Sequence, residues 1–168
     1  SIASYLEAAR HAPDHPMPYW GMAHAMGPNP NSRYSGMPDD PKGEGFKAIK
    51  KAMDRIENAS DMEAKLIQAL YTLYDKDTYP DAKGRDQAYL AEMRKLNRDY
   101  PNDPDIAALY ASSYMSIQRW NYWDNQGEPI SETLAVAKAL EHIMSKDLSH
   151  PGVLHLHIHL IEASAEPE

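Results

Sequence analysis

Four of the chain's eight histidines gather in one short segment, residues 150–162, which reads HPGVLHLHIHLIE and ends in a glutamate. If this segment is a helix, turning about 100° per residue, His155, His159 and Glu162 share one narrow polar stripe between two apolar flanks. Imidazoles at positions i and i+4 and a carboxylate at i+7 can meet one divalent transition-metal ion. The spacing therefore predicts a candidate metal site on a buried helix.

The same stripe has two interpretations that need no metal. Glu162 can accept a hydrogen bond from a histidine and raise its basicity, which would suit a ligand-binding or catalytic site. Alternatively, the histidines of a buried helix hydrogen-bond to the backbone or to a carboxylate and only support the fold. His157 points toward the apolar side and His150 stands at the helix start, so both are predicted to be structural.

A strand is the competing interpretation of this segment. Alternation in HLHIHL would place His155, His157 and His159 on one face, as in zinc sites built on β-sheets. Pro151 and Gly152, together with helical patterns in the rest of the chain, favour the helix.

Helical periodicity and cap residues divide the whole chain into short helices. Ser60 and Glu63 form the sequence pattern of a capping box, and Ser131 is expected to cap a later helix. The pattern predicts helices over residues 2–10, 16–26, 44–58, 61–74, 85–100, 105–117, 131–146 and 150–163. Long loops are expected over residues 27–41 and 118–130, because both are rich in Pro, Gly and Asn or in aromatic residues.

Two of these helices carry a clear apolar stripe that should face a core. The predicted buried set of the helix over 44–58 is Phe46, Ile49, Met53 and Ile56. That of the helix over 131–146 is Leu134, Ala137, Leu140, Ile143 and Met144.

Composition excludes several classes of function. The 168 residues are 42% hydrophobic and 25% charged, which is ordinary for a globular protein, and the formal net charge is -8. This charge disfavours binding to nucleic acid and to anionic lipid. The chain has no cysteine, which excludes disulfides and thiolate metal sites and leaves the compartment open. No apolar run approaches the roughly 20 residues of a membrane span, so membrane insertion is not expected.

An internal repeat relates segments that are distant in the sequence. Similar helix starts, with Asp or Ser near Pro and then a compact apolar helix, begin at Ala12, Tyr100 and Leu148. Adding 135 to the first segment aligns it with the third. Trp20 then matches His155, and His24 matches His159. Helix pairs that close with Asp-Pro before the next pair are typical of tetratricopeptide repeats, here lengthened by inserted loops.

Four segments carry a more specific resemblance. YWGMAHAMGPNPN at 19–31, LYASSYM at 109–115, WNYWDNQGEPI at 120–130 and HPGVLHLHIHLIEAS at 150–164 occur in this order. The chain resembles a bacterial family of tetratricopeptide-repeat proteins with little assigned function. The resemblance implies one all-α domain over residues 1–168, a right-handed superhelical solenoid of about four antiparallel helix pairs. It also implies a piece of a longer, soluble protein of the bacterial cytoplasm or periplasm.

The repeat register places one groove at the centre of the functional prediction. Trp20 and His24 should face the same concave surface as their counterparts on the last helix, and His24 could add a third imidazole to the stripe. The loop with Trp120, Asn121 and Trp123 would either fold over this groove as a lid or plug a joint of the solenoid. The loop at Asn29 would act in the same way.

Two functions from different classes remain open. The first is a binding scaffold whose concave groove takes a protein, a peptide or a small molecule. The second is a metal-binding protein or metal-dependent enzyme, in which His155, His159, Glu162 and His24 hold a divalent transition metal that activates water or oxygen. No nucleophile elbow, phosphate-binding loop or dinucleotide fingerprint is present in the sequence.

Overall fold

The computed structural model of the protein describes residues 2–36 and 40–165. The chain divides into two compact units. Unit 1 comprises Ser1–Pro28 and Met37–Tyr89, and unit 2 comprises Asn29–Gly36 and Leu90–Glu168. The regular secondary structure of the described residues is helical, and the only extended pairing among them is an isolated antiparallel bridge between Trp123 and Pro129. The predicted all-α class is confirmed.

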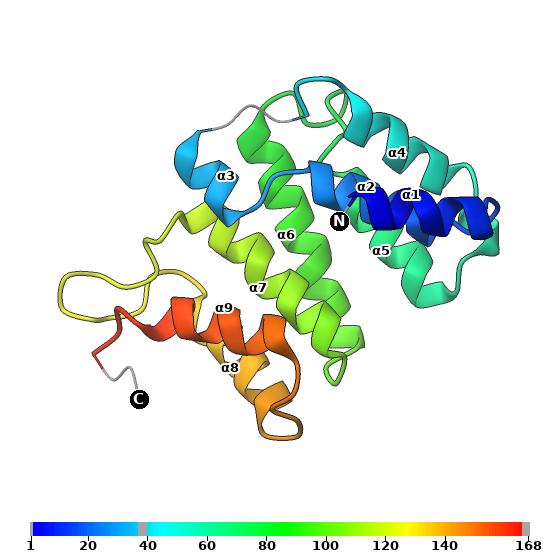
Figure 1. Cartoon of the computed structure of the whole chain (residues 1–168). Coiled ribbons are helices and arrows are strands. Elements are labelled where there is room, and N and C mark those ends of the chain that lie inside the picture. The colour runs from blue at the N-terminus through cyan, green and yellow to red at the C-terminus, as the bar shows by residue number, and fades with distance from the viewer. Residues whose placement is uncertain (1, 37–39, 166–168) are drawn as a thin grey trace. The chain divides into compact units, whose positions relative to one another are not determined.

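Unit 1 contains four short helices, one turn of 3₁₀-helix and the beginning of a longer helix (Figure 1). The elements are α1 (Ile2–His11), α2 (Met17–Met26), α4 (Glu44–Met53), η1 (Ile56–Asn58), α5 (Asp61–Tyr71) and the first part of α6 (Ala82–Asp99). The Ser60–Glu63 capping box is present as predicted, with reciprocal side-chain to backbone bonds that start α5. Helix α2 packs against α1, α4 and α5 and is the centre of this unit.

The core of unit 1 is formed mainly by the buried faces of α2, α4 and α5. Its fully buried members include Ala23 of α2, Ile49 and Ala52 of α4, and Ile67 of α5. The apolar side chains of α5 and of the turn after it are all buried: Leu66, Ile67, Leu70, Leu73 and Tyr74.

Close approach between helices in this unit depends on two glycines. A β-carbon at Gly21 of α2 would collide with the ring of Tyr5 of α1, so the missing side chain lets the two helices touch. Gly45 of α4 leaves room for Tyr74 in the same way. A β-carbon there would lie 2.5 Å from the Tyr74 hydroxyl oxygen.

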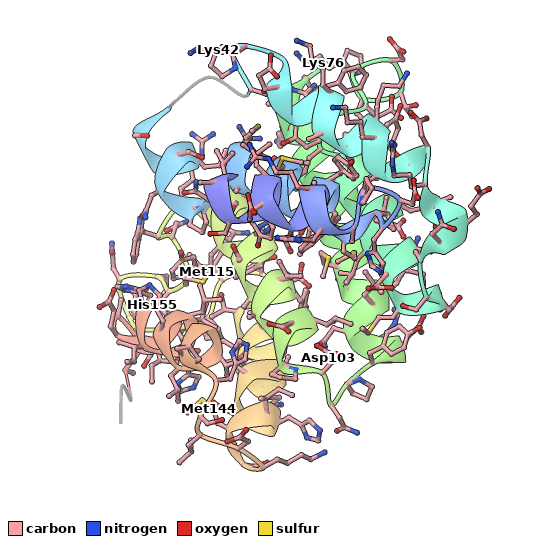
Figure 2. The ribbon with its side chains drawn as sticks, turned by 45° about the vertical axis from the view of Figure 1, so that its right-hand side comes forward. Lys42, Lys76, Asp103, Met115, Met144 and His155 are labelled. Atoms are coloured by element: carbon pink, nitrogen blue, oxygen red, sulfur yellow. The ribbon has the colours of Figure 1, made fainter. Side chains whose placement is uncertain are left out.

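Unit 2 is built mainly from three helices that pack against one another (Figure 1). They are α7 (Pro104–Gln118), α8 (Thr133–Met144) and α9 (Pro151–Ile161). The unit also includes the short α3 (Pro30–Ser35) and the rest of α6. Asp103 accepts a hydrogen bond from the Ile106 amide and so caps α7, at whose start it stands in Figure 2.

The core of unit 2 is centred on α7, which is buried on most sides. Tyr114 is completely buried, and its hydroxyl bonds to Thr133 Oγ1 at 2.6 Å and to the Ile130 carbonyl at 2.8 Å. Other buried members come from all three helices: Ile106, Ala107, Ala111, Met115, Val136, Leu140, Ile143, Val153 and Leu160. The tyrosine therefore joins α7 to the start of α8 through a satisfied polar contact inside the core.

The predicted loop over residues 27–41 contains a helix. Asn29 and Ser32 form a capping box in which each side chain bonds to the other residue's backbone amide, and α3 follows. Pro30 at the first helical position has no amide to leave unsatisfied. Asn29 and Pro30 are typical of a helix start, but the high content of Pro, Gly and Asn in this stretch favoured the prediction of a loop. Residues 37–39 of this stretch lie outside the described residues.

Several predicted helix faces and caps are wrong in detail. Phe46 is 39% exposed and Leu134 is 49% exposed, whereas the smaller Ala48 and Ala52 face the core of unit 1. The helix predicted over 44–58 ends at Met53 and continues only as the 3₁₀ turn. Ser131 does not cap α8, because it has a left-handed φ of 55° and the helix starts two residues later. Packing against neighbouring helices selected the buried face, which periodicity alone could not do.

Two expectations about the histidine segment are also overturned. The strand interpretation is wrong, since residues 151–161 are helical. The helix is not buried on both flanks, because only Val153 and Leu160 are buried and Ile158 is 60% exposed. Helix α9 therefore lies at the surface of unit 2 with one face on α7 and α8.

Within the described part of the chain, no helix combines the length and the apolar character needed to cross a membrane.

Candidate functional site

The start of α9 explains why His150 precedes a proline. Its Nδ1 accepts a hydrogen bond from the Val153 amide at 3.1 Å, which caps the helix. Because Nδ1 is the acceptor, Nε2 carries the proton and can donate to Asp105 Oδ1 at 3.1 Å. His150 thus connects α9 to the first turn of α7, and its predicted structural role is confirmed.

The predicted stripe on α9 is present and faces outward. The rings of His155 and His159 meet edge to face with their centroids 4.7 Å apart, and His159 Nδ1 lies 3.3 Å from Glu162 Oε1. His155 and Glu162 are exposed, and the His159 side chain keeps 35% of its surface accessible. The three residues are therefore in contact and open to solvent.

His157 lies on another side of the same helix. Its side chain is only 13% exposed, and its Nε2 is 3.5 Å from Glu141 Oε1 of α8. This contact fits the predicted structural role and separates His157 from the stripe.

The loop after α7 brings Trp120 against the histidines. Its ring meets that of His159 edge to face, with a centroid distance of 5.1 Å. Arg119 and Trp120 have left-handed φ values of 51° and 72°, a conformation that costs a non-glycine residue energy and turns the chain sharply. The turn directs the indole of Trp120 toward α9, whereas Asn121 is exposed.

Trp123 anchors the same loop to α9. Its indole Nε1 donates a hydrogen bond of 2.6 Å to the carbonyl of Leu160, in the last turn of the helix, where carbonyls lack a helical partner. Tyr122, between the two tryptophans in sequence, is 2% exposed. Burial raises the Tyr122 pKa to about 12. Trp123 and Tyr122 thus pack inside unit 2.

The predicted residues of unit 1 form their own aromatic pair. Trp20 and His24 stack with centroids 5.2 Å apart and planes 12° from parallel, and Trp20 Nε1 donates to the Leu66 carbonyl at 3.1 Å. The repeat register matched this pair with His155 and His159, and each pair makes a ring contact across one helical turn. His24 belongs to unit 1 and α9 to unit 2. Asn29, which was predicted to line the groove, uses its side chain to cap α3.

The potential metal ligands among the described residues do not form a three-residue cluster. Across the parts of the chain that the structure describes, no group of three or more His, Asp or Glu side chains is arranged to hold a metal ion. His159 and Glu162 use their closest approach for a hydrogen bond, so Glu162 partners an imidazole in this conformation.

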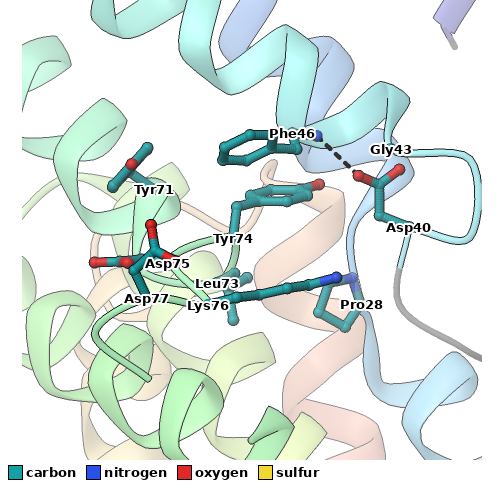
Figure 3. A pocket seen from close by; sticks show the side chains of 10 residues that line it. All are labelled: Pro28, Asp40, Gly43, Phe46, Tyr71, Leu73, Tyr74, Asp75, Lys76 and Asp77. Atoms are coloured by element: carbon teal, nitrogen blue, oxygen red, sulfur yellow. Dashed lines mark hydrogen bonds between the residues drawn. The ribbon is translucent and has the colours of Figure 1, made fainter. Parts of the chain in front are cut away.

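Unit 1 contains a pocket that the sequence patterns did not indicate (Figure 3). Its volume is about 360 Å³, within the range of ligand-binding cavities. The lining comes from the segment after α2, the segment before α4, α4 itself, the end of α5 and the following turn: Pro28, Asp40, Gly43, Phe46, Tyr71, Leu73, Tyr74, Asp75, Lys76 and Asp77. One residue could have indicated this pocket from the sequence. Phe46 does not share the helix face of the buried alanines of α4, so its large apolar ring points away from the core.

The carboxylates of this pocket have different partners. Asp40 accepts hydrogen bonds from the amides of Gly45 and Phe46, each 2.9 Å long, so the start of α4 partly offsets its charge. Hydrogen bonds from the hydroxyl and amide of Thr78 lower the Asp75 pKa. Asp77 is exposed, and its backbone amide adds a further hydrogen bond to the Asp75 carboxylate. Asp75 therefore remains anionic near neutral pH.

A comparison of the chain with protein-family models, curated proteins and solved structures finds no match.

Proposed function

We propose that this protein is a helical binding module of the tetratricopeptide-like solenoid type, and that its unit 1 pocket binds a ligand carrying an amine or guanidine beside an apolar group. A lysine or arginine side chain of a peptide has this chemistry, as does a small aromatic amine. The single observation that carries the proposal is the pocket itself, a cavity of about 360 Å³ with aromatic walls and an excess of acidic side chains.

The aromatic walls favour a cation over a neutral group. Phe46 is a large apolar side chain left 39% exposed at the pocket, and Tyr71 and Tyr74 add two further rings. A cation over an aromatic face gains about 0.5–2 kcal/mol, depending on how far it is desolvated. Lys50 already approaches the Phe46 ring, with Nζ 5.9 Å from the centroid, so this ring accepts a positive charge within the protein itself.

The charge balance points in the same direction. Three aspartates and one lysine line the pocket, which leaves two negative charges in excess. In Figure 3 the stem of Lys76 runs below the Tyr74 ring toward Pro28, on the other side of the pocket from Asp75 and Asp77. The net charge of -8 on the chain also attracts cations over longer distances.

The direct test compares ligands that differ in charge but share an aromatic ring. Benzylamine, benzyl alcohol and benzoate would be titrated into isotopically labelled protein, and the amide shifts around Tyr74 and Asp75 followed by NMR. We expect saturable shifts with benzylamine, weaker ones with the alcohol and none with benzoate. The tripeptide Ala-Lys-Ala should shift the same amides, and Ala-Glu-Ala should not.

Matched variants separate the pocket from the general charge of the protein. Phe46→Ala and Asp77→Asn should each weaken benzylamine binding by roughly three- to tenfold, because each interaction contributes about 1 kcal/mol. Asp54→Asn removes the same charge from the far end of α4, away from the pocket lining, and should leave binding unchanged. Equal binding of benzoate and benzylamine, or unchanged binding in Phe46→Ala, would refute the proposal.

A further inference from the structure

The geometry points to a second, independent site: His155 and His159 form a two-imidazole chelate on the surface of α9 for a divalent transition-metal ion such as Zn²⁺, Ni²⁺ or Cu²⁺. In this site Glu162 is a positioning residue that bonds to His159 and is not itself a ligand. The inference uses only unit 2 and does not depend on the unit 1 pocket.

The separation of the two rings fits a shared ion. With a metal–nitrogen distance of about 2.0–2.1 Å, the ion lies about 3.2 Å from each ring centre. Two imidazoles that subtend about 90–110° at the ion then have centroids about 4.5–5.2 Å apart. The observed separation is 4.7 Å. The backbone of α9 therefore already holds both rings at the distance that chelation requires.

The state of His159 is set by Glu162. The carboxylate oxygen lies 3.3 Å from His159 Nδ1 and can only accept, so Nδ1 carries the proton and Nε2 keeps its lone pair. A carboxylate that bonds the far nitrogen of a metal-bound imidazole fixes its tautomer and raises its basicity as a ligand. This explains how Glu162 can serve a metal site although the described residues contain no cluster of three ligating groups.

His155 is available as the second ligand. It is exposed, and neither of its ring nitrogens bonds to any other described residue. An exposed ring can turn about its side-chain bonds from the edge-to-face contact into a chelating orientation without displacing a neighbour. The other histidines of α9 are engaged elsewhere, His150 as the helix cap and His157 with Glu141. The donor set is therefore two imidazoles, which suits late first-row transition metals.

Trp120 supplies a built-in reporter of this site. Its ring lies 5.1 Å from the His159 ring, centroid to centroid. A Cu²⁺ or Ni²⁺ ion bound at His159 Nε2 would be close enough to quench the indole fluorescence. Trp20 in unit 1 and Trp123, whose indole bonds to Leu160, provide the remaining signal.

The experiment titrates purified protein with Cu²⁺ and Ni²⁺ by fluorescence and with Zn²⁺ by calorimetry. We expect one equivalent of metal with a dissociation constant in the micromolar range and quenching that disappears in Trp120→Phe. His155→Ala and His159→Ala should each abolish the one-to-one isotherm. His142→Ala, which removes an exposed histidine that bonds to Asn102 of unit 2, should bind metal as the wild type does.

Two measurements distinguish a positioning role of Glu162 from a merely structural one. Glu162→Ala should weaken metal binding by about tenfold or more, with Glu162→Gln less affected because its amide oxygen still accepts the bond. In the metal-free protein, ¹⁵N NMR should show His159 as the Nδ1–H tautomer, and Glu162→Ala should shift it toward the mixture of a free imidazole. The inference is overturned if the double variant of His155 and His159 keeps the wild-type stoichiometry and affinity. It is equally overturned if the wild type binds no metal at millimolar concentration.

Discussion

Gly45→Ala provides the sharpest test of how unit 1 is packed. An alanine would normally stabilise a helix by about 1 kcal/mol relative to glycine. Here the added β-carbon would lie 2.5 Å from Tyr74 Oη, 2.8 Å from Cε1 and 2.9 Å from Cζ, all closer than real contacts allow. Tyr74 is 5% exposed, and its hydroxyl donates to the Ala23 carbonyl at 2.5 Å, so the ring cannot move without breaking that bond.

The expected magnitude follows from three contributions. Overpacking costs about 1–3 kcal/mol, and loss of the Tyr74 hydrogen bond costs about 1 kcal/mol. The higher helix propensity of alanine compared with glycine offsets about 1 kcal/mol of this loss. The net loss in the free energy of unfolding is therefore about 1–3 kcal/mol. Because Tyr74 also lines the pocket, benzylamine binding should weaken in the same variant.

Urea unfolding followed by circular dichroism measures this change, with Gly84→Ala as the control. Gly84 lies in the first turn of α6, and the nearest atom to its added β-carbon would be 3.5 Å away, so this variant should gain up to about 1 kcal/mol. In a Tyr74→Phe background, which lacks the closest atom, Gly45→Ala should cost less than in the wild type. Stabilisation by Gly45→Ala, or equal costs in the two backgrounds, would refute the packing argument.

Three further predictions concern two buried tyrosines, the N-cap of α5 and the loop after α7. Burial raises the pKa of Tyr89 and raises the pKa of Tyr110 to about 12. Both phenols are therefore neutral in the folded protein, and their contribution to the free energy of unfolding is complete below pH 10 and is lost as the pH rises toward 12. Tyrosine ionisation, followed by absorbance at 295 nm, and the loss of folded structure should occur over the same pH range. Hydrogen bonds from the amide and hydroxyl of Ser60 lower the Glu63 pKa. The resulting stabilisation of the fold is present above the pKa of Glu63 in the unfolded chain and is lost as the pH falls. Thermal melting should therefore show that Ser60→Ala lowers the free energy of unfolding by about 1 kcal/mol at pH 7, and by less in acid. Trp123→Phe should cost about 1 kcal/mol and speed amide hydrogen exchange in the last turn of α9, and unchanged exchange there would contradict the anchoring role.

Local signals in the sequence predicted the helices well. The capping box at Ser60 and Glu63 and the cap at His150 act through bonds between residues three apart, so a single sequence contains all the information needed to place them. The contact between His155, His159 and Glu162 was predicted for the same reason, because helical spacing alone brings those side chains together.

The candidate sites were only partly predictable. The pocket of unit 1 joins Phe46 to Asp75 and Asp77, residues that are distant in the sequence, so no periodicity relates them. The exposure of Phe46 and Leu134 could not be foreseen either. A hydrophobic stripe shows which residues share a face, but the neighbouring helix decides which part of that face it covers.

The sequence by itself determined the all-α class, most helix boundaries and the stripe of two histidines and a glutamate, because each depends on backbone geometry within a few turns. Only the tertiary structure decided that α9 lies at the surface of unit 2 and that Trp120 contacts His159. Burial and long-range contact depend on which helices pack together. That packing is the sum of many weak contacts between segments far apart in the chain, and no local pattern encodes it.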